Sequence, residues 1–199
     1  MNAWMLGTVG FILYFIYDIN SLKWQNRILH QFFWLGTLCL CASAVGSMWG
    51  VPLSLRAEQP AGIVCGAGGA LFFILLVYTL FFAIPFEETY VEENRRRRAC
   101  TEGVYALCRH PGILWFAGLF LCLWGVTGEA SRGVYFISMI VWNYLYALFQ
   151  DRWTFPGTFE NYREYRRTAP FLLPNRRSIR ACFAGKGAGK RGTKEGDAR

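Results

Sequence analysis

The sequence predicts an all-α, polytopic membrane protein with about five transmembrane helices. Of its 199 residues, 54% are apolar and 18% aromatic, which is too hydrophobic for an ordinary soluble domain. Uncharged stretches recur along the chain, and most match the roughly 18 to 20 residues that cross a bilayer. Lys and Arg gather in alternate connecting segments. These three observations favour a membrane bundle.

Four of the five predicted spans are uncharged stretches long enough to cross a bilayer: 31–55, 59–86, 111–128 and 133–150. The first candidate, 3–17, has only 15 residues before Asp18 and is short for a span. Ile19 extends it if the Asp18 carboxylate reaches the interface. We therefore count this N-terminal stretch as a span, which brings the total to five.

The distribution of basic residues predicts the orientation of these spans. Nineteen of the 21 Lys and Arg residues lie in 18–30, 86–110 and 151–199, and only Arg56 and Arg132 lie in the other connections. By the positive-inside rule, the N-terminus is outside and the C-terminus is cytosolic. The net charge of +8 follows from this topology, so we expect a lipid bilayer and no nucleic acid as partner. No basic residue precedes the first apolar stretch, so no cleavable signal peptide is expected.

Small residues recur at intervals of four on two predicted spans, which predicts close packing between those spans. On the second span they are Ala42, Gly46 and Gly50, and on the third they are Gly62, Gly66 and Ala70. Gly68 and Gly69 enlarge the glycine patch of the third span. With no strand before it and no lysine after it, this patch favours helix packing over a phosphate-binding loop.

The seven cysteines form no CxxC pair and no cluster with histidine at metal-ligand spacing. Four lie in predicted spans and three on the reducing side of the membrane. We interpret them as small apolar filler and expect no disulfide and no metal site.

The cytosolic connection after the third span is strongly charged. Glu92 and Glu93 each precede an arginine by four residues, a spacing that favours a short interfacial helix with its basic end toward lipid headgroups. Binding of an anionic substrate by Arg95–Arg98 is the alternative. Residues 1–98 thus form one unit, comprising three membrane helices and this basic loop.

A very short connection, 129–132, joins the fourth and fifth spans and predicts an antiparallel helical hairpin. The start of one helix then meets the end of the other. We therefore expect Arg109, His110 and Pro111 to lie at the same membrane face as Gln150 and Asp151, within the reach of a side chain.

The chain after the fifth span divides into an interfacial segment and a tail. In 153–174, Phe159, Tyr162 and Tyr165 recur at intervals of three, and charged residues take the other face. This segment should lie flat on the cytosolic side. Beyond Pro174 the chain is rich in Gly, Lys and Arg, so 175–199 is predicted as a basic tail, disordered from Ala184 onward.

The junction before the fourth span is the strongest candidate site. Pro111 opens that helix behind a cation, Arg109, and an imidazole, His110. A helix start of this kind presents unpaired backbone donors and titratable groups at the lipid-water boundary. Such a junction suits an anionic or zwitterionic cofactor.

Several short motifs occur here in a defined order. Gly103-Val104-Tyr105 precedes Arg109-His110-Pro111, the hairpin follows, and Tyr162-x-x-Tyr165 and Pro170-x-x-x-Pro174 end the series. Together they resemble the isoprenylcysteine carboxyl methyltransferase and phospholipid methyltransferase superfamily of integral membrane enzymes. The resemblance covers about 99–174, which we take as a methyltransferase-like catalytic core.

The resemblance implies a cytosolic pocket for S-adenosylmethionine, closed by the C-terminal segment, and a lipophilic or membrane-associated methyl acceptor that arrives from the bilayer. One wall of the pocket would be Gly103, Val104, Tyr105, Arg109, His110 and Pro111, and the other Gln150, Asp151 and Tyr162. Arg109 and the helix start suit the cofactor's carboxylate, and Tyr105 its adenine or sulfonium. Asp151 suits its amino group or ribose hydroxyls.

His110 is the candidate catalytic residue. It either acts as a base toward the acceptor or hydrogen-bonds the cofactor, and the second role is favoured. Methyl transfer from a sulfonium requires mainly alignment in a dry site, with no metal.

The chain departs from the superfamily pattern at three places. Ile113 stands where a tyrosine is usual, and Gln150 replaces the first of two glutamates. No arginine lies one turn before that pair, near Tyr146, which disfavours carboxyl methylation of prenylated proteins. The departures at Ile113 and Gln150 leave a non-catalytic membrane scaffold as one alternative. An NADPH-dependent membrane sterol or steroid reductase is the other, because that group has a similar C-terminal hairpin and a similar Tyr- and Pro-rich ending.

Overall fold

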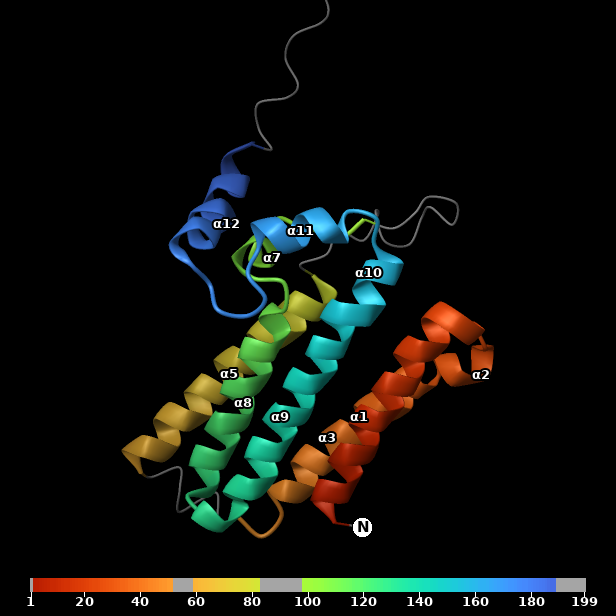
Figure 1. Ribbon diagram of the computed structural model, residues 1–199. Coiled ribbons are helices and arrows are strands. Elements are labelled where there is room, and N and C mark those ends of the chain that lie inside the picture. The colour runs from red at the N-terminus through yellow and green to blue at the C-terminus, as the bar shows by residue number, and fades with distance from the viewer. Residues whose placement is uncertain (1, 52–58, 83–97, 189–199) are drawn as a thin grey trace, which may run out of the picture.

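The computed structural model describes residues 2–51, 59–82 and 98–188, and all regular secondary structure in these ranges is helical (Figure 1). Three helical stretches are long and apolar enough to cross a membrane: Ala3–Trp24, Arg27–Ser47 and Pro60–Leu80. Pro111–Thr127 is a shorter apolar helix. The chain therefore has the composition and helical structure of a membrane protein.

The N-terminal helices form a closely packed pair. Helix α1 (Ala3–Ile19) continues into a π-helical turn, η1 (Asn20–Trp24), so the first helical stretch is longer than the sequence pattern predicts. A short helix, α2 (Arg27–His30), leads to α3 (Phe32–Ser47), which packs along α1. A Cβ added at Gly36 would lie only 2.9 Å from the Gly10 carbonyl oxygen, so the two backbones nearly touch.

The sequence pattern predicts that the Asp18 carboxylate reaches the membrane interface, but the structure places it in the protein interior. Asp18 is only 4% exposed, and its carboxylate accepts a hydrogen bond from the Thr154 hydroxyl at 3.3 Å. Thr154 lies in η3 (Gln150–Thr154), a second π-helical turn. A partner on another helix thus holds this carboxylate inside the protein.

The small-residue ridges do not join the second and third spans, so that prediction is wrong. Helix α5 (Pro60–Phe81) packs on α8 (Pro111–Thr127), and a Cβ at Gly66 would meet nothing within 4 Å. Helices α5 and α8 approach each other at different positions: a Cβ at Gly118 of α8 would lie 2.7 Å from the Phe72 ring of α5. Gly68 and Gly69 face α8, and the glycine patch is helix packing.

Helices α8 and α9 (Gly133–Phe149) follow each other through Gly128 and a single 3-10 turn, η2 (Ala130–Arg132). Gly128 ends α8 in the left-handed conformation, with φ of 62°. The Arg132 guanidinium donates to the carbonyl oxygens of Ser47 and Trp49, just past α3. This connection therefore lies at the same end of the molecule as the end of α3.

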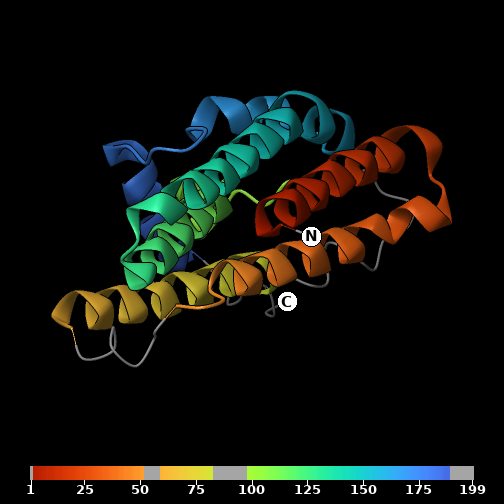
Figure 2. The same ribbon diagram turned by 90° about the horizontal axis from the view of Figure 1, so that it is seen from below.

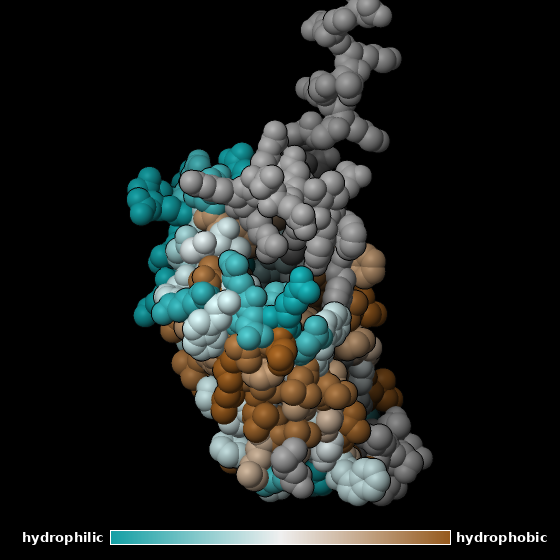
Figure 3. Space-filling model, turned by 90° about the vertical axis from the view of Figure 1, so that its right-hand side faces the viewer, coloured by the Kyte–Doolittle hydropathy of each residue, from teal (hydrophilic) through white to brown (hydrophobic). Residues whose placement is uncertain are grey.

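Five buried residues form the core between α1, α8 and α9: Phe11, Phe116, Phe120, Phe136 and Met139. Seen from below, α1 and α9 lie on one side of the bundle and α3 and α5 on the other (Figure 2). Large apolar side chains also cover much of the outer surface, below a hydrophilic end (Figure 3). An apolar surface of this extent fits a lipid environment.

The remaining short helices gather at one end of the bundle: α7 (Val104–Leu107), α10 (Phe155–Thr158), α11 (Tyr162–Thr168) and α12 (Arg176–Ala188) (Figure 1). Tyr162 and Tyr165 of α11 are buried, as their spacing predicts. The predicted interfacial helix around Glu92 and Glu93 lies outside the described residues.

Part of the tail predicted as disordered is helical. Helix α12 runs to Ala188, four residues past Ala184. Its start is capped by a reciprocal pair, in which Asn175 and Ser178 exchange hydrogen bonds between side chain and backbone. The helix also packs against α7, so capping and a tertiary contact outweigh its unfavourable glycine content.

Candidate functional site

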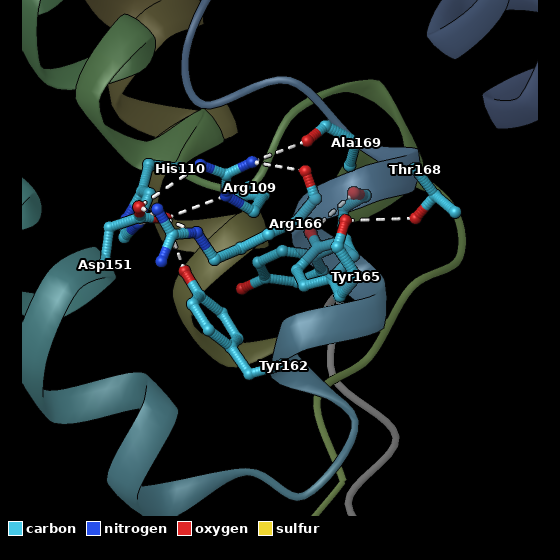
Figure 4. Close-up of polar contacts among 9 residues, drawn as sticks. Arg109, His110, Asp151, Tyr162, Tyr165, Arg166, Thr168 and Ala169 are labelled. Atoms are coloured by element: carbon cyan, nitrogen blue, oxygen red, sulfur yellow. Dashed lines mark hydrogen bonds and ion pairs between the residues drawn. The ribbon is translucent and has the colours of Figure 1, made fainter.

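The site is built on the buried ion pair between Arg109 and Asp151 (Figure 4). Arg109 Nε donates to Asp151 Oδ1 at 2.7 Å and Nη2 donates to Oδ2 at 3.2 Å, which makes the pair bidentate. Arg109 precedes α8 and Asp151 follows α9. The structure thus brings them together as the short 129–132 connection predicts.

Two residues of α11 complete the surroundings of the carboxylate. The Tyr162 hydroxyl donates to Asp151 Oδ1 at 2.6 Å, and Arg166 Nε lies 3.7 Å from Oδ2. Burial raises the pKa of Asp151, but hydrogen bonds from its neighbours outweigh burial and hold it well below its usual range. Burial, together with the Asp151 charge, raises the pKa of Tyr162 far above its ordinary range. The site therefore contains an ionised carboxylate and a neutral phenol.

Arg109 also fastens the C-terminal segment over the start of α8. Its Nη1 donates to the carbonyl oxygens of Arg166 and Ala169, at 3.2 Å and 2.7 Å. Four of its five N–H groups are thus engaged within the chain. This arrangement leaves at most one guanidinium N–H group for the cofactor carboxylate that the sequence pattern assigns to Arg109.

Two backbone donors just before α8 are likewise engaged. The N–H groups of Arg109 and His110 donate to the carbonyl oxygens of Pro170 and Phe171, at 2.9 Å and 3.3 Å. Pro111 has no N–H group to offer, and the Ile113 N–H donates back to the His110 carbonyl. The C-terminal segment thus takes donors that the sequence analysis assigned to a cofactor.

His110 differs from its neighbours because its side chain keeps an unused polar atom. The imidazole is 7% exposed and lies between two rings, stacked on Phe155 with centroids 5.4 Å apart and tilted against Phe171 at 5.1 Å. Nε2 lies 3.5 Å from Asp151 Oδ1 and has no hydrogen-bond partner among the described residues. Burial lowers the pKa of His110 below its ordinary 6.5, although Asp151 opposes this shift. The ring is therefore neutral at pH 7.

The first motif of the predicted wall adjoins this cluster through α11, because Tyr105 packs against the buried group of Tyr162, Tyr165 and Ala169. Gly103 is exposed, with φ of 57°, and begins the turn into α7. The Tyr105 hydroxyl donates to the Thr79 carbonyl of α5, and its own carbonyl accepts from Tyr165. Burial raises the pKa of Tyr105 to about 12. Tyr105 thus attaches α7 to α5 and α11.

Gln150 lies in a different polar cluster from Asp151. Its amide donates to the Tyr146 hydroxyl at 2.9 Å, near Asp18 and Thr154 on the side of α1. The π-helical turn η3 therefore presents neighbouring residues to two different polar clusters: Asp151 to the Arg109 cluster, and Gln150 to the Asp18 cluster. A sequence pattern that treats 150 and 151 as one pair does not anticipate this separation.

Sequence reasoning missed the two rings that enclose His110. Phe171 directly follows Pro170 of a recognised motif, so that motif was a usable signal. Phe155 carried no comparable signal, because it is one of 17 phenylalanines. Ile113, which departs from the superfamily pattern, is buried in the apolar interior.

Comparisons of the chain with protein-family models, with curated proteins and with solved structures found no match. The resemblance to the membrane methyltransferases is one of ordered sequence motifs alone.

Proposed function

We propose that this protein is an integral membrane methyltransferase that transfers a methyl group from S-adenosylmethionine to a small lipophilic or membrane-associated acceptor. In this proposal the chain crosses the membrane five times, with its N-terminus outside, and the cofactor site lies at the cytosolic end of the α8–α9 hairpin. The site is centred on His110, Asp151 and Tyr162, and the segment after α11 covers it.

The observation that carries the proposal is the unpartnered Nε2 of His110. Buried polar atoms in folded proteins nearly always have a partner, so an orphan atom in an aromatic niche points to a ligand or an ordered water. Phe155 and Phe171 contact the imidazole ring, and the Asp151 carboxylate lies 3.5 Å from Nε2. Both favour a ligand that carries positive charge, such as a sulfonium or an α-ammonium group.

The residues present fit this cofactor in part. S-adenosylmethionine supplies an electrophilic methyl carbon, and its sulfur keeps the electron pair of the broken bond. His110, neutral at pH 7, has a nitrogen available to hydrogen-bond the cofactor or to take the proton of the acceptor. Phe155 and Phe171 exclude water from this nitrogen, which favours methyl transfer over hydrolysis.

One observation favours the non-catalytic scaffold as a second candidate. The Arg109 guanidinium donates hydrogen bonds to Asp151 and to the C-terminal segment, as a residue with a purely structural role would do. A scaffold requires these structural contacts of Arg109 and requires no ligand at His110. The two candidates therefore differ in whether the His110 niche binds a nucleoside.

The experiment is a ligand-dependent unfolding measurement on the detergent-solubilised protein. A ligand at about 100 times its dissociation constant adds about 2.7 kcal/mol to the free energy of unfolding. We expect S-adenosylhomocysteine to stabilise the protein and NADPH to have no effect. His110→Ala should lose this stabilisation, whereas His30→Ala, at an exposed position, should keep it.

Each contrary result selects an alternative. No shift with millimolar S-adenosylhomocysteine, from a protein that still unfolds cooperatively, favours the scaffold. A shift with NADPH alone favours the reductase. Equal binding by both histidine variants rejects His110 as a ligand-binding residue.

A further inference from the structure

Helix α12 has an outward face that joins apolar and cationic side chains. Ile179 and Phe183 are one helical turn apart and are 42% and 71% exposed. Arg176 and Arg180, also one turn apart and exposed, flank them on the same side. A surface helix in water normally buries such an apolar pair, so this face indicates a partner with both apolar and anionic character.

The opposite side of α12 is already fixed in place. Ser178 is buried and caps the helix together with Asn175, and the helix packs against α7. The rotation of α12 is therefore set by its buried side. The ridge of Ile179 and Phe183 has no other element of the described chain to cover it.

The apolar outer surface of the bundle lies close to the start of the segment that leads into α12. The segment before α12 starts at Phe171, whose ring packs edge-on against Tyr144 at 5.9 Å. Tyr144 is exposed on the apolar outer face of α9, together with Val141 and Leu145. Leu173, between this contact and α12, is 74% exposed. The connection into α12 thus begins beside the lipid-facing surface of the bundle.

We propose that α12, with Leu173, is an anionic-lipid-binding element that inserts Ile179 and Phe183 among the lipids while Arg176 and Arg180 contact phosphate groups. Each arginine near an anionic surface strengthens docking about fivefold. A purely zwitterionic lipid surface lacks this contribution and favours only the apolar part of the face. This surface is separate from the His110 niche, and it needs no cofactor.

The test is hydrogen exchange of the α12 backbone amides in the full-length protein reconstituted into nanodiscs. One preparation contains phosphatidylcholine alone and the other contains one-third phosphatidylglycerol. We expect slower exchange in α12 with phosphatidylglycerol, and loss of this difference in high salt, which screens exposed charges. Soluble glycerol phosphate added to phosphatidylcholine discs should not reproduce the effect.

A matched pair of variants separates local binding from general charge. Arg176→Gln with Arg180→Gln should weaken docking about 25-fold. Arg163→Gln with Arg167→Gln removes the same charge at the same spacing from exposed positions of α11, and should keep the difference between the two lipids. Equal exchange in both lipids, or an equal loss in both variants, overturns the proposal.

Discussion

At the scale of single residues, Arg109 and Asp151 act mainly as a lock between distant parts of the chain. They are 42 positions apart in sequence, and their side chains are 8% and 4% exposed. A second arginine-carboxylate pair, Arg132 with Glu129, has the same 2.7 Å distance but is 26% and 38% exposed. The chain thus contains a buried pair and its partly exposed counterpart.

This contrast gives the first prediction. Asp151→Asn leaves the Arg109 charge buried without a counterion and should cost about 3 kcal/mol of unfolding free energy. Glu129→Gln breaks a pair that water screens and should cost less than about 1 kcal/mol. Denaturant unfolding in detergent measures both values. Equal costs would show that burial does not distinguish the two pairs.

His110 gives a prediction for the pH dependence of stability. Because its folded pKa lies below 6.5, the unfolded chain binds a proton at this ring first as the pH falls. The stability contribution of a neutral His110 is therefore complete above about pH 6.5 and declines below it, by at most about 1.4 kcal/mol per pH unit. His110→Gln should remove this part of the pH profile, with His30→Gln as the control. A profile that His110→Gln leaves unchanged would contradict the assignment.

At the scale of elements, the close contact of α1 with α3 decides how the N-terminal helices pair. Gly10 and Gly36 bring the backbones together, whereas Gly66 of α5 faces open space. Glycine spacing alone does not tell these cases apart, because a small residue allows close approach without requiring it.

The two kinds of glycine should respond in opposite ways to substitution. Gly36→Ala places a methyl group 2.9 Å from a backbone oxygen, which cannot rotate away, and should cost about 1 to 3 kcal/mol. Gly66→Ala meets no atom within 4 Å and should be neutral, or should stabilise α5 by up to about 1 kcal/mol. Unfolding titrations of both variants in the same detergent provide the comparison. Similar losses would mean that α5 has a partner at Gly66.

At the scale of the whole molecule, the polar groups separate toward two ends. Arg132 joins the α8–α9 connection to the end of α3, and the His110 site lies with α7 and α11 at the other end (Figure 1). The sequence predicts the first end as external and the second as cytosolic. Helices α8 and α9 have 17 residues each, so their crossing is the part of the five-span topology that most needs a test.

Accessibility labelling provides that test. A cysteine introduced by Ser131→Cys should react with a membrane-impermeant maleimide from outside intact cells or right-side-out vesicles. One introduced by Arg163→Cys should react only after permeabilisation. Both positions are exposed in the structure, and peptide mass spectrometry separates them from the native cysteines. Reaction of both positions from the same side would contradict the crossing of α8 and α9.

The sequence by itself determined the helical class, the approximate bounds of the apolar helices and the meeting of Arg109 with Asp151. These features depend on local composition, on the length of a bilayer crossing and on a connection too short for any other path. They are therefore readable along the chain.

Only the tertiary structure decided which groups remain free and which helices touch. Pro170 and Phe171 accept from the backbone N–H groups of Arg109 and His110, Gln150 turns toward Asp18, and His110 Nε2 keeps no hydrogen-bond partner among the described residues. Each outcome results from competition among groups distant in sequence for the same buried space and the same hydrogen bonds. The sequence shows which groups could form these contacts, and tertiary packing determines which of them do.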